Sequence, residues 1–309
     1  EKPKVKIPTG QLELGETRHQ EPDRNYHQGG RSFYFFDFDD NIAFLTTSLV
    51  LFHKQTGEEC YLSSSNWALH HGTIGRYPPY EDYEIRYDDL TGTFRNFRDL
   101  EISEIEKLSG KKQLFVQDVQ EALKFPDLQW KGPSWNCFYH AAFNQRPISV
   151  ITARGHHAHT IQEGVREFVK AGHLPVEPNY LSVFAVSNKK VREHLGDHHY
   201  KSSIPELKQR AIRASVEKAI EVYGFNQHHR FGMSDDDPKN IQLITEEMTR
   251  LKSIYPQMSF FMIETHNGSF IKHEVTEQGV KSAQTSSLMD DGTDAASQLE
   301  LFNSTRRKT

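Results

Sequence analysis

Five short apolar runs, each bounded by polar or turn-forming residues, stand out along the central part of the chain. They cover residues 33–38, 148–152, 181–187, 229–234 and 258–264. Runs of this length without strict polar alternation are typical of strands buried on both faces of a parallel sheet. The pattern therefore predicts a buried strand at each of the five places.

Helical periodicity fills the intervals between the last four runs. Apolar residues recur every three or four positions over 160–171, 205–223 and 240–254, and Gly172 and Gly224 follow the first two segments. Glycine is common just past a helix end because it readily adopts left-handed backbone angles. Strands that alternate with helices predict an α/β fold, with a three-layer, Rossmann-like core around a parallel sheet.

The interval between the first and second runs is too long to be a simple connection. It holds about 110 residues, whereas connections between a strand and its neighbouring helix usually take about 2–6. We expect an inserted cap domain over 46–145, which begins with a hairpin over 48–63 and would cover the end of the first strand. The core would then comprise 31–45 and 146–275. The polar, aperiodic flanks predict a disordered N-terminal arm over 1–30 and a C-terminal tail over 276–309.

Composition and charge exclude several classes of protein. The chain has 309 residues, 36% hydrophobic and 26% charged, with a net charge of −5. This charge makes nucleic acid an unlikely partner, because no overall basic field is present. No apolar stretch approaches the roughly 18 residues of a membrane helix, so no membrane partner is expected. The opening residues lack the apolar core of a secretory signal. Cys60 and Cys137 fit no metal-ligand spacing and are expected to be free thiols, which favours a reducing, cytoplasmic location.

Polar side chains with chemical potential follow the predicted strands at their carboxyl ends. The first run leads into Asp37 and Asp39, and the second leads into Thr152 and Arg154. The fourth is followed by Asp235 and Asp236, and Lys208 lies near the start of the second predicted helix. Ligands of open α/β sheets bind at this edge. The sequence thus predicts that acids, a hydroxyl and an ammonium group meet there.

This set of groups suits phosphoryl transfer. Clustered carboxylates repel one another unless a cation compensates, and all-oxygen ligands suit Mg²⁺. A carboxylate can attack phosphorus to give an aspartyl-phosphate, and a second can protonate the leaving oxygen and later deprotonate water. A hydroxyl and an ammonium can bind the remaining phosphoryl oxygens. The simpler readings are a solvated strand end at Asp37 and Asp39, and a helix cap at Asp235 and its neighbours.

Four stretches resemble the four motifs of the haloacid dehalogenase-like (HAD) hydrolase superfamily, in that family's order. They are Asp37-Phe38-Asp39-Asp40-Asn41, Ile151-Thr152, Lys208 and Asp235-Asp236-Asp237-Pro238-Lys239-Asn240. The paired-Asp first motif is specific when the other three follow it. The insertion falls where this family has its C1 caps, although those are usually helical, and 46–145 looks partly strand-like and aromatic.

The resemblance implies a role for each of these polar residues. Asp37 would be the nucleophile and a Mg²⁺ ligand, and Asp39 would be the general acid and base, with its carbonyl group on the metal. Thr152 would hold the phosphoryl group, and Lys208 would stabilise the charge of the nucleophile. The lysine has two rivals in the sequence, Lys201 and Lys218.

The fourth motif would complete the metal site. Asp236 would be the acidic ligand, with Asp235 beside it, because Asn240 then stands four residues on, where the family often has Asp or Asn. Two features depart from the family pattern: Asn41 replaces the usual Thr or Val, and the 28 residues from Lys208 to Asp236 are on the long side. The presence of Asp39 favours phosphate hydrolysis, since members that cleave carbon–halogen bonds usually lack this second acid.

The expected function is a Mg²⁺-dependent phosphatase that acts on a small phosphorylated substrate through an aspartyl-phosphate. Thr152 and Arg154 are the expected contacts to the anionic substrate. The alternatives are a phosphotransferase, a phosphatase of nucleic-acid or protein ends, and a non-catalytic HAD-like binding module. The sequence carries no indication of an oligomeric state.

Overall fold

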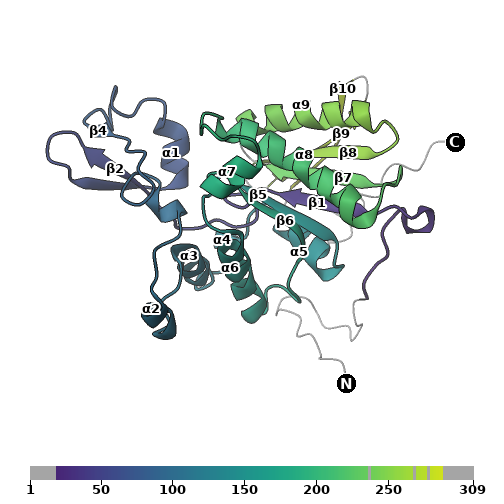
Figure 1. Ribbon diagram of the computed structural model, residues 1–309, viewed down its shortest axis with the longest axis horizontal. Coiled ribbons are helices and arrows are strands. Elements are labelled where there is room, and N and C mark those ends of the chain that lie inside the picture. Colours follow the sequence, from purple (N-terminus) through teal and green to yellow (C-terminus); the bar gives the residue numbers. More distant parts are fainter. Residues whose placement is uncertain (1–18, 236–237, 267–268, 277–278, 288–309) are drawn as a thin grey trace.

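The computed structural model describes residues 19–235, 238–266, 269–276 and 279–287. Its centre is a mixed, mostly parallel sheet of seven strands in the order β10-β9-β8-β7-β1-β5-β6 (Figure 1). The five parallel strands are β1 (Ser32–Phe36), β5 (Pro147–Thr152), β6 (Asn179–Ala185), β7 (Arg230–Asp235) and β8 (Ser259–His266). They confirm the five predicted strands to within about two residues.

Two strands at one edge were not predicted. β9 (Ser269–Thr276) and β10 (Gly279–Ser287) extend the sheet beyond β8 in antiparallel fashion. Their sequences mix polar and apolar residues and so lack the apolar run of a strand buried on both faces. The predicted C-terminal tail over 276–309 is therefore wrong for 279–287, and residues 288–309 lie outside the described part.

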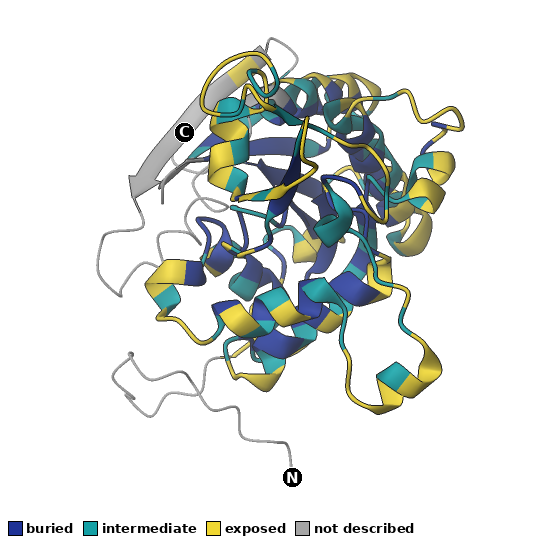
Figure 2. Cartoon of the chain, turned by 90° about the vertical axis from the view of Figure 1, so that its left-hand side faces the viewer, coloured by how far each residue is buried: buried dark blue, intermediate teal, exposed yellow. Residues whose placement is uncertain are grey.

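Helices cover both faces of the sheet, which explains the apolar runs. Successive residues of β1 point to opposite faces: Phe33 and Phe35 join one buried cluster, and Tyr34 and Phe36 join another. The first cluster includes residues of α8 (Ile204–Tyr223) and α9 (Pro238–Ile254). The second includes residues of α3 (Leu114–Ala122), α5 (Trp135–Phe143) and α6 (Ala158–Lys170). Figure 2 shows the buried strands between partly exposed helices.

The three predicted helices are confirmed as α6, α8 and α9. Gly172 and Gly224 have φ angles of +81°, as expected for glycines that follow helix ends. The short helix α7 (Lys189–His194), between β6 and α8, was not predicted.

A second, three-stranded sheet lies between β1 and β5 in the sequence. It consists of β2 (Leu49–His53), β3 (Glu59–Leu62) and β4 (Tyr83–Glu84) in the order β3-β2-β4. The predicted hairpin is confirmed, and Gly57 in its turn has a φ of +73°. With α1 (Ser64–His70) and η2 (Arg95–Phe97), this sheet forms its own small apolar cluster and stands to the left in Figure 1.

Several of the other elements between β1 and β5 pack with the main sheet. The short helices α2 (Glu104–Leu108) and α4 (Asp127–Trp130) precede and follow α3 in the sequence. Phe115 of α3 and Phe138 of α5 pack in the cluster that contains Tyr34 and Phe36 of β1. The small sheet therefore occupies only part of the expected 46–145 insertion.

The segment before β1 is docked on the main sheet. Arg146 forms an ion pair of 3.0 Å with Asp23, with both side chains largely buried, and Asn25 donates a hydrogen bond of 2.9 Å to the carbonyl of His228. The 3-10 turn η1 (Tyr26–Gln28) follows. The predicted disorder of 1–30 is thus wrong for 19–30, because polar side chains in that stretch have buried partners that the local pattern does not show.

The described residues also show the state of the cysteines and the character of the helices. Cys60 and Cys137 form no disulfide. No helix in the described ranges has the length and apolar character needed to cross a membrane.

Candidate functional site

Asp37 stands at the carboxyl end of the central strand. Its backbone N–H continues the ladder from β1 to β7 by donating to the carbonyl of Ser234 at 3.0 Å. The side chain, only 8% exposed, lies 3.2 Å from the ammonium of Lys208, measured between Oδ1 and Nζ. A carboxylate this buried requires a compensating positive group, and Lys208 provides one.

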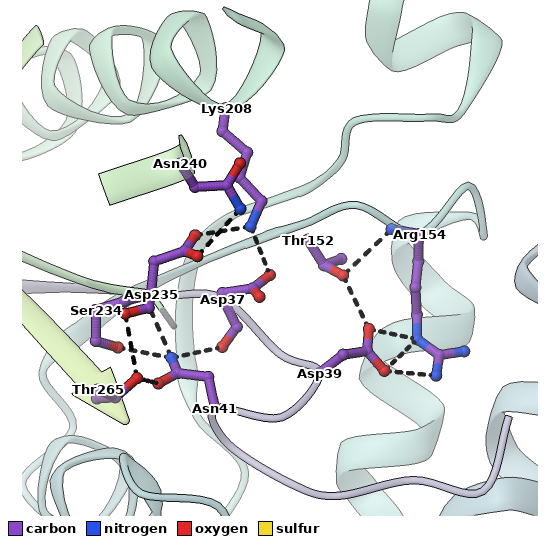
Figure 3. Close-up of polar contacts among 10 residues, drawn as sticks. All are labelled: Asp37, Asp39, Asn41, Thr152, Arg154, Lys208, Ser234, Asp235, Asn240 and Thr265. Atoms are coloured by element: carbon purple, nitrogen blue, oxygen red, sulfur yellow. Dashed lines mark hydrogen bonds and ion pairs between the residues drawn. The ribbon is translucent and has the colours of Figure 1, made fainter. Parts of the chain in front are cut away.

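Lys208 links two carboxylates from neighbouring strands (Figure 3). Its Nζ lies 2.7 Å from Oδ2 of Asp235, the last residue of β7, as well as 3.2 Å from Asp37. A capping box between Ser203 and Glu206 fixes the start of α8, and Lys208 sits in its second turn on the buried face. The rival lysines, Lys201 and Lys218, are exposed, so the structure brings Lys208 to this cluster.

Asp235 and Asn240 also meet here. The amide of Asn240, near the start of α9, donates a hydrogen bond of 3.1 Å to Oδ1 of Asp235. The two oxygens of Asp235, which has no exposed surface, thus receive hydrogen bonds from α8 and α9. Asp236, expected as the acidic metal ligand, lies outside the described residues.

Asn41 ties the loop after β1 to the rest of the site. Its fully buried amide donates to the carbonyl of Asp37 at 3.1 Å and to the hydroxyl of Ser234 at 2.8 Å. Its carbonyl accepts from the hydroxyls of Ser134 and Thr265, each at 2.9 Å. Because a carboxamide has both donors and an acceptor, this Asn can connect four segments of the chain.

Asp39 points away from Asp37, toward Arg154 (Figure 3). The Arg154 guanidinium holds both carboxylate oxygens, with Nε–Oδ2 at 2.8 Å and Nη2–Oδ1 at 2.7 Å. The hydroxyl of Thr152, at the end of β5, lies 3.4 Å from Oδ2. Asp39 remains 26% exposed. Thr152 therefore reaches the site as expected, whereas Arg154 contacts Asp39, a partner the sequence did not indicate.

Next to Asp39, the backbone turns sharply at Asp40. This residue has a φ of +55°, a region that side chains rarely adopt and that Asp tolerates better than most. Burial, and then the neighbouring charge of Asp39, raise the pKa of the Asp40 carboxyl, and a hydrogen bond from Ser64 of α1 opposes them. The loop that carries Asp39 and Asp40 thus contacts α1, the helix beside the small sheet.

The donor chemistry around Asp37 fits a hard divalent cation. The carboxylates of Asp37 and Asp235 and the backbone carbonyl of Asp39 are oxygen donors, the type that Mg²⁺ prefers. Within the described ranges, no group of three or more His, Cys, Asp or Glu side chains is arranged to hold a metal ion. The expected set includes Asp236, which those ranges do not cover.

Comparison with protein-family models, curated proteins and solved structures finds no match to this chain.

Sequence reasoning missed the residues that hold the site in place. Arg154 is contacted by Thr47, Phe97 and Phe115, and Asp118 accepts a hydrogen bond from Thr47. All four residues come from the long interval between the first two strands. No spacing rule connects residues so far apart. His156, two residues after Arg154, is also fully buried, and burial followed by the charge of Arg154 lowers its pKa.

Proposed function

We propose that this chain is a Mg²⁺-dependent phosphatase of the HAD type that acts through an aspartyl-phosphate on Asp37. One observation carries the proposal: a buried lysine joins the acid at the end of the central strand to the acid at the end of its neighbour, with Nζ 3.2 Å from Asp37 and 2.7 Å from Asp235. Surface acids that serve only solubility need no such partner.

In the first step, an Asp37 carboxylate oxygen attacks phosphorus, and the bond from phosphorus to the substrate's leaving oxygen breaks. Asp39 gives its proton to that leaving oxygen, so that an alcohol departs. The ammonium of Lys208 and the hydroxyl of Thr152 offset the charge that develops on the phosphoryl oxygens and on Asp37.

In the second step, Asp39 takes a proton from water as the water oxygen attacks phosphorus. The bond between phosphorus and the Asp37 oxygen then breaks, which releases inorganic phosphate and restores the carboxylate. Asp39 is protonated again and ready for the next substrate.

The proposed metal ligands are Asp37, Asp235, Asp236 and the backbone carbonyl of Asp39. Bound Mg²⁺ would supply positive charge to the phosphoryl oxygens. The protein's own part is to keep the acids close together in a largely buried site, which Lys208 and Asn240 do for Asp37 and Asp235.

We also propose that the small sheet acts as a cap, with a small phosphorylated substrate bound beneath it. Two contacts support this: the N–H of Gly155 donates to the carbonyl of Phe97 at 2.9 Å, and the N–H of His157 donates to a carboxylate oxygen of Asp99 at 2.8 Å. They link the segment that follows the small sheet to the loop after Thr152, beside the site.

The experiment is hydrolysis of an aryl phosphate by the full chain with Mg²⁺, with a chelator, and with the Asp37→Asn variant. We expect turnover that the chelator removes and that Asp37→Asn lowers by at least about 10³-fold, since the nucleophile is lost. Hydrolysis that persists in Asp37→Asn, or its absence from the wild type on aryl and alkyl phosphates alike, would reject the proposal.

A further inference from the structure

We propose that Arg154 is a positioning residue for Asp39, the proposed general acid and base: it fixes this side chain through a guanidinium clamped between two aromatic rings. This inference rests on the proposed phosphatase function. It assigns Arg154 a role that acts through Asp39 rather than through contact with the substrate.

The contact between the two side chains fixes orientation as well as charge. Nε lies 2.8 Å from Oδ2 and 3.1 Å from Oδ1 of Asp39, and Nη2 lies 2.7 Å from Oδ1. A planar fork that meets both oxygens of a carboxylate restrains the rotation of the acid. Lysine, a single rotatable point charge, cannot reproduce this restraint.

The guanidinium is itself held from three sides. The ring centroids of Phe97 and Phe115 lie 4.8 and 4.7 Å from its central carbon, and such stacking on aromatic faces suits arginine. Nη2 also donates to the hydroxyl of Thr47 at 2.7 Å, and that hydroxyl donates to Asp118 of α3. Arg154 is only 1% exposed, so it has almost no freedom to move alone.

This clamp connects the insertion to the acid. Phe97 belongs to η2 and packs with Phe94 against the small sheet's cluster. The carbonyl of Phe97 accepts a hydrogen bond from the N–H of Gly155, the residue after Arg154. Phe115 belongs to α3 on the main sheet. The orientation of Asp39 therefore depends on both parts of the chain between β1 and β5.

A leaving-group series tests the role of Arg154, because a general acid matters most when the leaving oxygen is a poor leaving group. Aryl phosphates need little protonation, whereas alkyl phosphates need it fully, and loss of a general acid costs about 10²–10⁴-fold. We expect Asp39→Asn to lower kcat for alkyl phosphates far more than for aryl phosphates. Arg154→Lys should give the same pattern, with an alkyl loss at least about tenfold larger than the aryl loss.

The double variant Asp39→Asn/Arg154→Lys separates positioning from other roles. If Arg154 acts through Asp39, the double variant is no slower than Asp39→Asn alone, because the two changes remove one function. Thr47→Val, which loosens the clamp but keeps the guanidinium, should give a weaker version of the alkyl-selective loss. It also serves as the test if Arg154→Lys fails to fold.

The control is Arg166→Lys, the same change in an exposed arginine of α6 that forms an ion pair with Glu177. It should leave the series unchanged.

Three results would overturn the inference. In the first, KM rises equally across the series in Arg154→Lys, which would assign Arg154 to substrate binding. The guanidinium Nη1, which has no hydrogen-bond partner among the described residues, would then be the contact to the substrate. Equal aryl and alkyl losses in kcat, or additive losses in the double variant, would leave Arg154 a structural role only. Rejection of the proposed phosphatase function gives a different result: the wild type shows no turnover, or Asp37→Asn retains it. Either of these outcomes would overturn both proposals.

Discussion

Replacing Lys208 by methionine removes one buried positive charge and keeps most of the side-chain volume. In the native protein, its ammonium lies within 3.2 Å of Asp37 and 2.7 Å of Asp235, whose side chains are 8% and 0% exposed. The variant leaves both carboxylates without that ammonium. The change therefore tests whether the cluster is a tightly coupled buried unit.

The expected cost follows from the burial of the two acids. Removing one partner of a buried ion pair costs about 3–5 kcal/mol, because the remaining charge stays out of water. For a chain of this size, such a loss lowers Tm by on the order of 5–10 °C. Asp235→Asn added to Lys208→Met removes one of the stranded charges, so the double variant should be more stable than Lys208→Met alone.

Urea unfolding followed by tryptophan fluorescence measures the effect. Lys218→Met is the matched control, because this lysine is exposed on the same helix, and it should change the free energy of unfolding by no more than about 0.5 kcal/mol. A loss of less than about 1 kcal/mol in Lys208→Met, similar to that of Lys218→Met, would refute the picture of a coupled buried cluster.

Three further predictions concern the surroundings of the site. Asn41→Ala leaves the hydroxyls of Ser134 and Thr265 without the acceptor they share. We therefore expect the free energy of unfolding in urea to fall by about 1–3 kcal/mol and kcat to be lower, and wild-type values in both assays would contradict the role of Asn41. Gly132→Ala would put a Cβ 2.3 Å from the backbone oxygen of Asn41, so urea unfolding should show a loss of about 1–3 kcal/mol and turnover should be slower. An unchanged free energy of unfolding would count against this close approach. Burial lowers the pKa of His156, so below about pH 6.5 the unfolded chain takes up a proton that the folded chain does not. The free energy of unfolding should therefore decrease as the pH is lowered, by at most about 1.4 kcal/mol per pH unit. His156→Leu should reduce that slope in urea unfolding between pH 5.5 and 7.5, and identical slopes in both proteins would argue against a buried neutral histidine.

The elements of the core were predictable where a single physical cause dominates. Every residue of strands β1, β5 and β7 is buried, so these strands appear in the sequence as mainly apolar runs. β9 and β10 lie at the sheet edge with polar residues in both, and their pattern resembles that of a tail. Docking of 19–30 depends on partners such as Arg146 and His228, which are distant in sequence.

The charged groups of the site and the contact of Lys208 with Asp37 were predictable, whereas the pairing of Arg154 with Asp39 was not. Asp37, Lys208 and Asp235 meet because parallel strands end at one edge and α8 starts near it. The partner of Arg154 could not be foreseen, since it depends on how Thr47, Phe97 and Phe115 fold around the guanidinium. The network around Asn41 joins residues that are distant in the sequence, such as Ser234 and Thr265.

The most direct test of the proposed chemistry is to trap the aspartyl-phosphate. The protein is mixed with an aryl phosphate and Mg²⁺, quenched during turnover, and treated with borohydride, which reduces an acyl phosphate to an alcohol. Peptide mass spectrometry should then find homoserine in place of Asp37 and unmodified aspartate at Asp39 and Asp235. Steady turnover with no reduced residue at position 37, or with reduction at another acid, would contradict the account.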